Sequence, residues 1–162
     1  MPPVKRLNRE FLMIYNRNVD AVYRLCYSFM KNKADAEDLT QETFLKLLSE
    51  KPAFENDRHE KGWLIVTASN LCRDSLKKWW RRNERFEDQL DLGYEQSFPD
   101  PAIMNALLSL KPDYKTPVYL YYYEGYTTSE IAAYLNCPEA TVRSRLSRAR
   151  AQLRNLLGGD AR

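Results

Sequence analysis

Apolar residues recur at intervals of three and four along most of this chain, the spacing that places them on one face of an α-helix. In the first third, this pattern predicts a long helix that ends near Lys31 and a second helix that begins at Asp35. The inner face of the first helix carries Phe11, Tyr15, Val22, Leu25 and Phe29. The inner face of the second carries Ala36, Leu39, Thr43, Leu47 and Leu48. The predicted fold class is all-α.

The stretch from Lys51 to Gly62 interrupts this periodicity, because it contains Pro52 and frequent charges. We therefore expect a loop there. A third helix is predicted to begin at about Trp63 and to continue to Arg82.

Residues 83–101 lose the helical pattern and carry six acidic side chains against one basic side chain. This composition, with Pro99 and Pro101, predicts a linker that does not fold alone. The flanking segments, residues 1–82 and 102–162, have net charges of +5 and +3. The chain is thus expected to form two small helical domains joined by an acidic linker.

The second domain is predicted to start with a helix from Ala102 to Pro112, and Pro117 is well placed to open a tyrosine-rich helix that ends at Gly125. Consecutive residues on a helix point in different directions, so the tyrosines are interpreted as packing within the domain rather than as a binding surface. They are Tyr119, Tyr121, Tyr122 and Tyr123.

A helix-turn-helix is predicted from Thr127 to Arg154. Thr127 and Glu130 have the spacing of a capping box, and the break at Asn136–Pro138 separates a short helix from a second one. The second helix carries an apolar stripe at intervals of three and four, formed by Val142, Leu146, Ala149, Leu153 and Leu156.

Most of the remaining positions of that helix are polar, and five of them are arginines: Arg143, Arg145, Arg148, Arg150 and Arg154. Such a helix fits the major groove of DNA, with its first residues at base edges and later arginines on phosphates. A solvated basic face on an ordinary helical hairpin is the alternative. The cap, turn, proline and basic second helix together favour DNA binding.

The end of the third helix combines tryptophans with cations, in the order Lys77, Lys78, Trp79, Trp80, Arg81 and Arg82. Aromatic residues among cations form a platform for bases and phosphates, whereas tryptophans at a helix end commonly pack in a core. We expect a mixture, with one tryptophan packed inside and the cations on a nucleic-acid backbone. A merely solvated helix end remains the alternative.

Several classes of site are not expected. Cys26, Cys72 and Cys137 lie far apart, and His59 is the only histidine, so neither a metal nor a cofactor is predicted. No glycine-rich phosphate loop or catalytic group stands out, and enzyme activity is not expected. There is no apolar run long enough for a membrane span and no hydrophobic region of a signal peptide at the N-terminus, so we expect a cytoplasmic protein.

Three motifs in sequence order resemble the bacterial RNA polymerase sigma factors of the sigma-70 family, in the two-domain form called extracytoplasmic-function (ECF) sigma factors. AEDLTQETFLKLL, from Ala36 to Leu48, is similar to the family's polymerase-binding segment. WLIVTASNLCRDSLKK, from Trp63 to Lys78, is similar to its promoter-melting helix. YTTSEIAAYLNCPEATVRSRLSRARAQLRNLL is similar to its minus-35-reading module.

The resemblance implies roles for named residues. The polymerase-binding candidates are Asp38, Gln41, Glu42 and Phe44, on or beside the exposed side of the second helix. The minus-ten DNA candidates are Asn70, Arg73, Asp74, Lys77, Lys78 and Arg81. The minus-35 DNA candidates are Glu139, Thr141, Arg143, Ser144, Arg145, Arg148 and Arg150. The loop at 51–62 is expected to receive a flipped base.

The resemblance also implies partners: core RNA polymerase, promoter DNA and an anti-sigma factor, without membrane insertion. Two positions depart from the family pattern, because Ala140 stands where many relatives have glycine and Cys137 stands where a small hydroxyl residue is common. Two rival hypotheses remain at this point. One is a stand-alone helix-turn-helix regulator, and the other is an interaction protein that sequesters a sigma factor or the polymerase.

Overall fold

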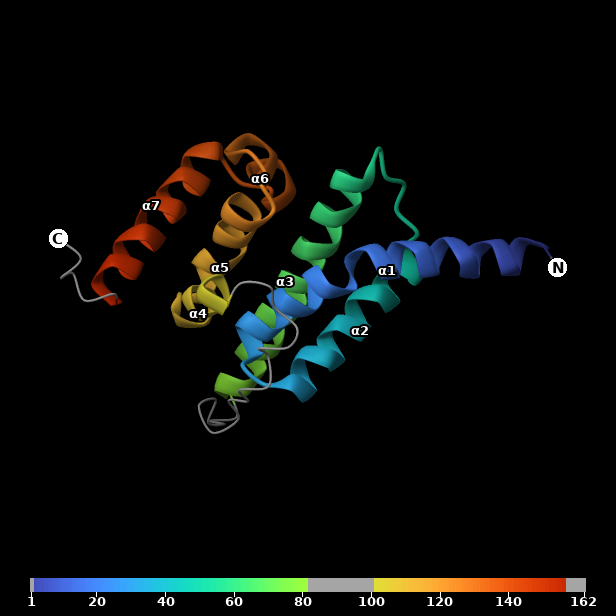
Figure 1. The fold of residues 1–162 in the computed structure, drawn as a ribbon, viewed down its shortest axis with the longest axis horizontal. Coiled ribbons are helices and arrows are strands. Elements are labelled where there is room, and N and C mark those ends of the chain that lie inside the picture. The colour runs from blue at the N-terminus through green and yellow to red at the C-terminus, as the bar shows by residue number, and fades with distance from the viewer. Residues whose placement is uncertain (1, 82–100, 157–162) are drawn as a thin grey trace.

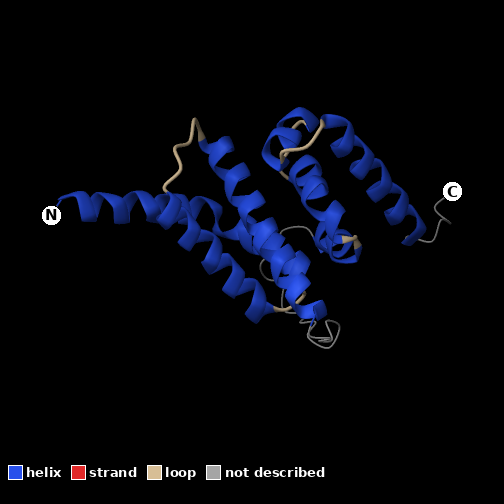
Figure 2. Cartoon of the chain, turned by 180° about the vertical axis from the view of Figure 1, so that it is seen from behind, coloured by secondary structure: helices blue, strands red, loops and turns tan. Residues whose placement is uncertain are grey.

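A computed structural model of the 162-residue chain describes residues 2–81 and 101–156 (Figure 1). These residues form helices joined by short turns, and no strand occurs among them (Figure 2). The all-α prediction is confirmed. The predicted acidic linker lies outside the described residues. We call residues 2–81 the first module and residues 101–156 the second module.

The first module packs three helices, α1 (Pro2–Met30), α2 (Lys33–Glu50) and α3 (Asp57–Arg81), against one another. Its core contains the fully buried side chains of Leu25, Phe29 and Ile65. The turn between α1 and α2 places Lys31 in the left-handed region, with φ of 65°. Asn32 then caps α2, because its side-chain oxygen accepts a hydrogen bond from the Asp35 amide at 2.8 Å.

The loop expected at Lys51–Gly62 is wrong in its second half, because α3 begins at Asp57 rather than at Trp63. The Asn56 side chain accepts a hydrogen bond from the His59 amide at 2.8 Å and so satisfies one of the free amides of the first turn. Acidic residues in that turn also suit the positive end of the helix dipole. The loop is therefore limited to residues 51–56.

The second module contains α4 (Pro101–Ser109), α5 (Pro112–Val118), the π-helical turn η3 (Tyr119–Tyr123), α6 (Thr128–Leu135) and α7 (Glu139–Leu156). The expectation that Pro117 opens a helix is wrong. Pro112 occupies the first turn of α5, and Pro117 lies inside that helix, two residues before the π-helical turn. A proline supplies no amide for the helical ladder, which explains why irregular helix follows it.

The tyrosines were expected in the core, and this prediction holds for only part of the set. Tyr119 is buried, whereas Tyr121 and Tyr122 are exposed and pack edge to face at 4.9 Å between ring centroids. Tyr123 is half-buried and stacks on Tyr119. The π-helical turn rotates successive side chains differently from an α-helix, so the burial pattern could not be read from α-helical spacing.

The two modules pack against each other, with α4 and α5 on α1, and α5 and α6 on α3. In Figures 1 and 2, α5 lies between α3 and α7, so α7 forms the outer edge of the second module. Lys115 of α5 sits in this interface with 2% of its surface exposed. Its amine donates to the Ser28 carbonyl of α1 at 2.7 Å and to the Leu107 carbonyl of its own module.

Candidate nucleic-acid and polymerase interfaces

The helix-turn-helix has the local geometry that its sequence predicts. The Thr127 hydroxyl accepts a hydrogen bond from the Glu130 amide at 3.1 Å, and the Thr127 amide donates to the Glu130 carboxylate at 2.9 Å. This reciprocal pair confirms the capping box. At the other end of α6, Asn136 adopts the left-handed conformation with φ of 55°, which ends the helix and turns the chain into α7.

Helix α7 divides into a buried stripe and an exposed basic face. Val142, Leu146 and Ala149 are buried against the rest of the second module. The exposed candidates are Arg143, Arg148 and Arg150, and Arg145 is half-buried. The arginines thus lie outside the core, as the spacing predicts.

Several of the minus-35 candidates lie together around a shallow hollow between α5 and α7. The hollow is lined by Asp113, Tyr114, Ala140, Thr141, Ser144, Arg145 and Arg148. The remaining candidates are held by their own module. Glu139 accepts from the Thr128 hydroxyl at 2.6 Å and pairs with Arg143 at 3.1 Å, whereas Arg150 donates to the Tyr122 hydroxyl at 2.6 Å.

The minus-ten candidates lie along α3. The exposed members of the set are Asn70, Asp74, Lys77, Lys78 and Arg81. Arg73 is half-buried, because its guanidinium pairs with Asp113 of α5 at 2.6 Å. The expectation that one tryptophan packs inside is confirmed, because Trp79 is 8% exposed whereas Trp80 is 61% exposed. The contact of the cations with a nucleic acid stays a prediction.

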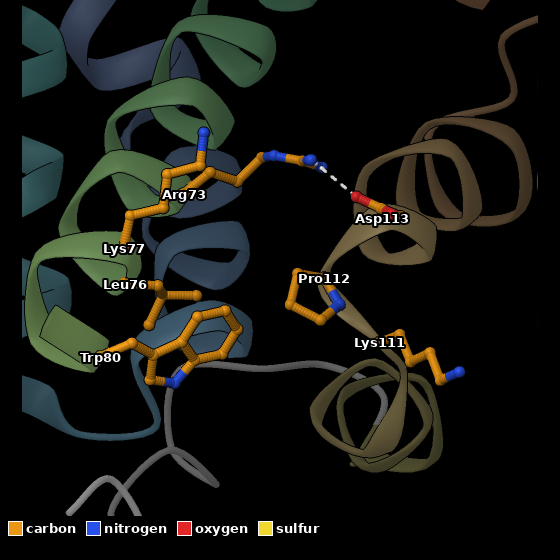
Figure 3. A pocket seen from close by; sticks show the side chains of 7 residues that line it. All are labelled: Arg73, Leu76, Lys77, Trp80, Lys111, Pro112 and Asp113. Carbon is orange, nitrogen blue, oxygen red and sulfur yellow. Dashed lines mark hydrogen bonds and ion pairs between the residues drawn. The ribbon is translucent and has the colours of Figure 1, made fainter. Parts of the chain in front are cut away.

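A pocket between the modules brings the end of α3 close to the start of α5. Figure 3 shows Arg73 reaching across it to Asp113, with Trp80 and Leu76 facing Pro112, while Lys111 points away from it. One exposed tryptophan and one candidate arginine of the first module therefore face the second module.

The polymerase-binding candidates on α2 separate into two groups. Asp38, Gln41 and Glu42 are exposed. The placement of Phe44 beside the exposed side is wrong, because only 2% of its surface is exposed and its ring packs on Tyr15 at 4.8 Å between centroids. Phe44 lies one helical turn from Thr40, which is also buried, so it belongs to the inner stripe.

Two exposed leucines of α2 were missed by the sequence reasoning. Leu45 is 61% exposed, and Leu48, which was expected in the core, is 44% exposed. Leu45 follows Gln41 by four residues and Asp38 by seven, so an apolar residue in this polar stripe was visible in the sequence. Helix α2 therefore presents two apolar side chains to solvent beside its acidic residues.

Two family models match this chain, one for each module. The model of sigma-70 region 2 matches residues 14–86, and the model of sigma-70 region 4 matches residues 101–153. The RNA polymerase sigma factor SigV of Bacillus subtilis is 34% identical over 131 residues, which cover 78% of each protein. The chain belongs to the sigma-70 family. Sigma factors direct RNA polymerase to promoters, and a stand-alone helix-turn-helix regulator is not favoured because region 2 is present as well.

Further comparisons assign this sigma factor to the ECF group. The ECF RNA polymerase sigma factor SigE of Mycolicibacterium smegmatis is 36% identical over 155 residues, which cover 89% of this chain and 60% of that protein. Among solved structures, the sigma factor RpoE of Bartonella quintana, in complex with the anti-sigma factor NepR, aligns with a TM-score of 0.69 and 25% identity over 94% of this chain and 97% of that one.

Two groups of this sigma factor with strongly shifted pKa values lie where the modules meet. A bidentate hydrogen bond from Arg58, together with the Thr127 amide, lowers the pKa of Glu130 to about 2. Burial lowers the pKa of Lys115 to about 7. The residues that the structure describes contain no cluster of three potential metal ligands and no helix long and apolar enough to cross a membrane.

Proposed function

We propose that this sigma factor binds core RNA polymerase through α2, reads the minus-ten element with α3 and reads the minus-35 element with α7. The observation that carries the proposal is the presence, on one chain, of a region 2 unit with an exposed acidic stripe and a region 4 unit with an exposed basic helix. Residues 1–82 and 102–162 are the proposed functional domains, and residues 83–101 are the proposed connector.

On α2, the proposed polymerase-binding surface consists of Asp38, Gln41 and Glu42, with Leu45 as its exposed apolar member. Phe44 supports this surface from below, because it is buried against α1. Acids around an exposed apolar side chain suit a partner that presents cations around an apolar patch.

On α3, opening of the minus-ten region requires that unstacked bases and their phosphates be held. Extrusion of a base costs a few kcal/mol of lost stacking, which contacts to the protein must offset. The proposed contacts come from the side chains of Asn70, Arg73, Asp74, Lys77, Lys78 and Arg81. Trp80 joins this set as a stacking surface, because it is exposed beside Lys77.

On α7, the hollow that contains Thr141, Ser144, Arg145 and Arg148 is the proposed site of contact with base edges and nearby phosphates. Arg143 and Glu139 hold each other and are proposed to contact DNA beside it. Arg150 is directed to Tyr122 and is assigned to the phosphate backbone.

The polymerase performs the bond formation in this scheme, so the sigma factor itself is proposed to catalyse no reaction and to act in the cytoplasm, where the polymerase works. An anti-sigma factor is a further proposed partner. Its support is the similarity to a sigma factor whose structure was solved with such a partner.

The proposal is tested by transcription with purified core polymerase on a promoter library. The wild-type chain is expected to co-elute with the core enzyme and to select a subset of promoters. Reversal of Asp38 and Glu42 to lysine is expected to abolish both results, while the matched reversal of Glu37 and Glu50, which are exposed on the same helix, has a smaller effect. A wild-type chain that binds duplex promoter DNA but never associates with core polymerase contradicts the proposal.

A further inference from the structure

Three ion pairs connect the modules within the described residues, and they share one polarity. Arg58 pairs with Glu130 at 2.7 Å, Lys61 with Glu124 at 3.3 Å, and Arg73 with Asp113 at 2.6 Å. In each case the cation belongs to α3 and the acid belongs to the second module. A row of cations on one helix thus faces a row of acids on the other module.

The cations are spread along α3 rather than gathered at one point. Arg58 and Arg73 are fifteen residues apart, which is roughly 22 Å along a helix at 1.5 Å per residue. Lys77, one of the minus-ten candidates, follows Arg73 by one helical turn and is exposed. At its Arg73 end, the row of cations therefore adjoins the face that we assign to minus-ten DNA.

The contacts of Arg58 show most clearly how an acid of the second module occupies a cation of α3. Its Nε and Nη2 atoms each donate to one oxygen of Glu130 at 2.7 Å, and Nη2 also donates to the Gly125 carbonyl at 2.8 Å. The guanidinium lies 4.2 Å from the centroid of the Tyr126 ring. A planar guanidinium fork binds a carboxylate and a phosphate with the same bidentate geometry, so the Glu130 carboxylate stands where a phosphate would fit.

Two of the three pairs are partly solvated, which makes them exchangeable. The side chains of Arg58 and Glu130 are 42% and 35% exposed, and those of Arg73 and Asp113 are 36% and 58% exposed. The third pair is less accessible, because the Glu124 side chain is only 9% exposed. Exposed ion pairs contribute little to stability, whereas a nucleic acid that replaces the acids also releases its condensed counterions. Low salt therefore shifts the exchange of carboxylate for phosphate toward the bound nucleic acid.

We propose that Arg58, Lys61 and Arg73 form a phosphate-binding strip on α3, and that Glu130, Glu124 and Asp113 occupy this strip when the two modules are packed together. The strip extends the minus-ten surface to the first turn of α3, and the second module acts as an internal substitute for the DNA backbone. The inference rests on the proposed function, since it assumes that the first module holds single-stranded promoter DNA.

The test is the salt dependence of binding between the full chain and a fluorescein-labelled single-stranded oligodeoxythymidine, followed by fluorescence anisotropy. Each lost phosphate contact lowers the slope of log K against log salt by about 0.7. Arg58→Ala and Lys61→Ala are each expected to lower the slope by this amount. Arg58→Lys keeps the charge and is expected to retain the slope while the affinity falls.

Neutralisation of the acids of the second module gives the decisive comparison. Glu130→Gln and Asp113→Asn are expected to raise the affinity several-fold, because they free the strip, whereas Arg58→Ala lowers it. If an ion pair only stabilised the packing of the modules, removal of the cation and removal of the acid would change the affinity in the same direction. Glutamine at position 130 can still accept the hydrogen bond from the Thr127 amide, so the cap of α6 is retained.

The exposed α2 pair Lys46–Glu50, at 3.6 Å, provides the matched control, and neither Lys46→Ala nor Glu50→Gln is expected to change affinity or slope. Circular dichroism confirms that each variant is folded. Unchanged slopes in Arg58→Ala and Lys61→Ala, or no oligonucleotide binding even after the acids are neutralised, overturn the strip. Neither measurement involves polymerase, so loss of polymerase association alone counts against the proposed function and leaves the strip standing.

Discussion

Helices α3 and α7 are both basic, yet the structure presents them differently. Two arginines of α7 pair within their own module, Arg143 with Glu139 and Arg150 with Tyr122. The cations at positions 58, 61 and 73 of α3 are held by the opposite module. If α7 binds duplex DNA as proposed, it can do so without a change in module packing, whereas part of α3 becomes available only when the modules separate.

The largest expected effect concerns the packing of α7 in the second module. Leu146 is buried in the second module, so Leu146→Ala removes apolar contacts and leaves a cavity. We predict a loss of about 2–5 kcal/mol in the free energy of unfolding, measured with urea. Leu45→Ala is the control, because that leucine is mostly exposed and its truncation should leave stability nearly unchanged. A stability loss of similar size in both variants would refute the assigned core.

The next effect acts on the contact between the modules without removing a charge. A Cβ atom at Gly62 of α3 would lie 2.6 Å from the ring of Tyr134 in α6, so Gly62→Ala forces that ring to move. Overpacking of this kind costs about 1–3 kcal/mol, and we expect it to weaken the packing of the modules. Faster hydrogen exchange in α5, where the modules meet, is the measurement.

The matched control for Gly62→Ala is the double variant Gly62→Ala with Tyr134→Ala, in which the clashing ring is absent. Hydrogen exchange in α5 should then be slower than in Gly62→Ala alone. Should the single variant exchange like the wild type, the close approach of α3 and α6 is not a constraint on module packing.

The smallest effect is a pH dependence from Lys115. Burial lowers the pKa of Lys115 to about 7, compared with an ordinary value of 10.5; the charge of Lys31 also lowers this pKa, whereas Cys72 raises it. Between these values the unfolded chain binds more protons than the folded chain, so stability increases as the pH rises from 7. The slope is at most about 1.4 kcal/mol per pH unit, and it vanishes below pH 7.

Urea unfolding of the wild type between pH 7 and 9 measures this slope, and Lys115→Met should flatten it. Burial raises the pKa of Cys72 above its ordinary value of 9.0 and that of Tyr119 above its ordinary value of 10.0, so both groups favour folding less above these values and the window stops at pH 9. A wild-type stability that falls from pH 7 to 9 would show that the Lys115 amine is not held in a buried site.

Local signals in the sequence predicted much of this molecule. The capping box of Thr127 and Glu130, the division of Trp79 from Trp80 and the buried stripe of α7 each depend on residues a few positions apart. Helical periodicity describes such neighbours well. It failed at Pro117, where the chain continues as a π-helical turn, and at Asn56, whose capping role was not recognised.

The remaining features depend on contacts between distant residues. Phe44 is buried because the rings of α1 cover it, and Leu48 is exposed although it lies beside the buried Leu47. Arg58 and Glu130 are seventy-two residues apart, so no periodicity relates them. The packing of the modules therefore depends on tertiary contacts, which the counts of charges along the chain could not reveal.

The most direct test is the distance between the modules before and after the sigma factor joins the polymerase on a promoter. Cysteines introduced at the exposed positions Ser49 of α2 and Asn155 of α7, with Cys137 replaced by serine, carry a fluorescent donor and acceptor. We predict high energy transfer in the isolated protein and a marked decrease in the complex with core polymerase and promoter DNA. Equal energy transfer in both states, in a complex that initiates transcription, would contradict the account.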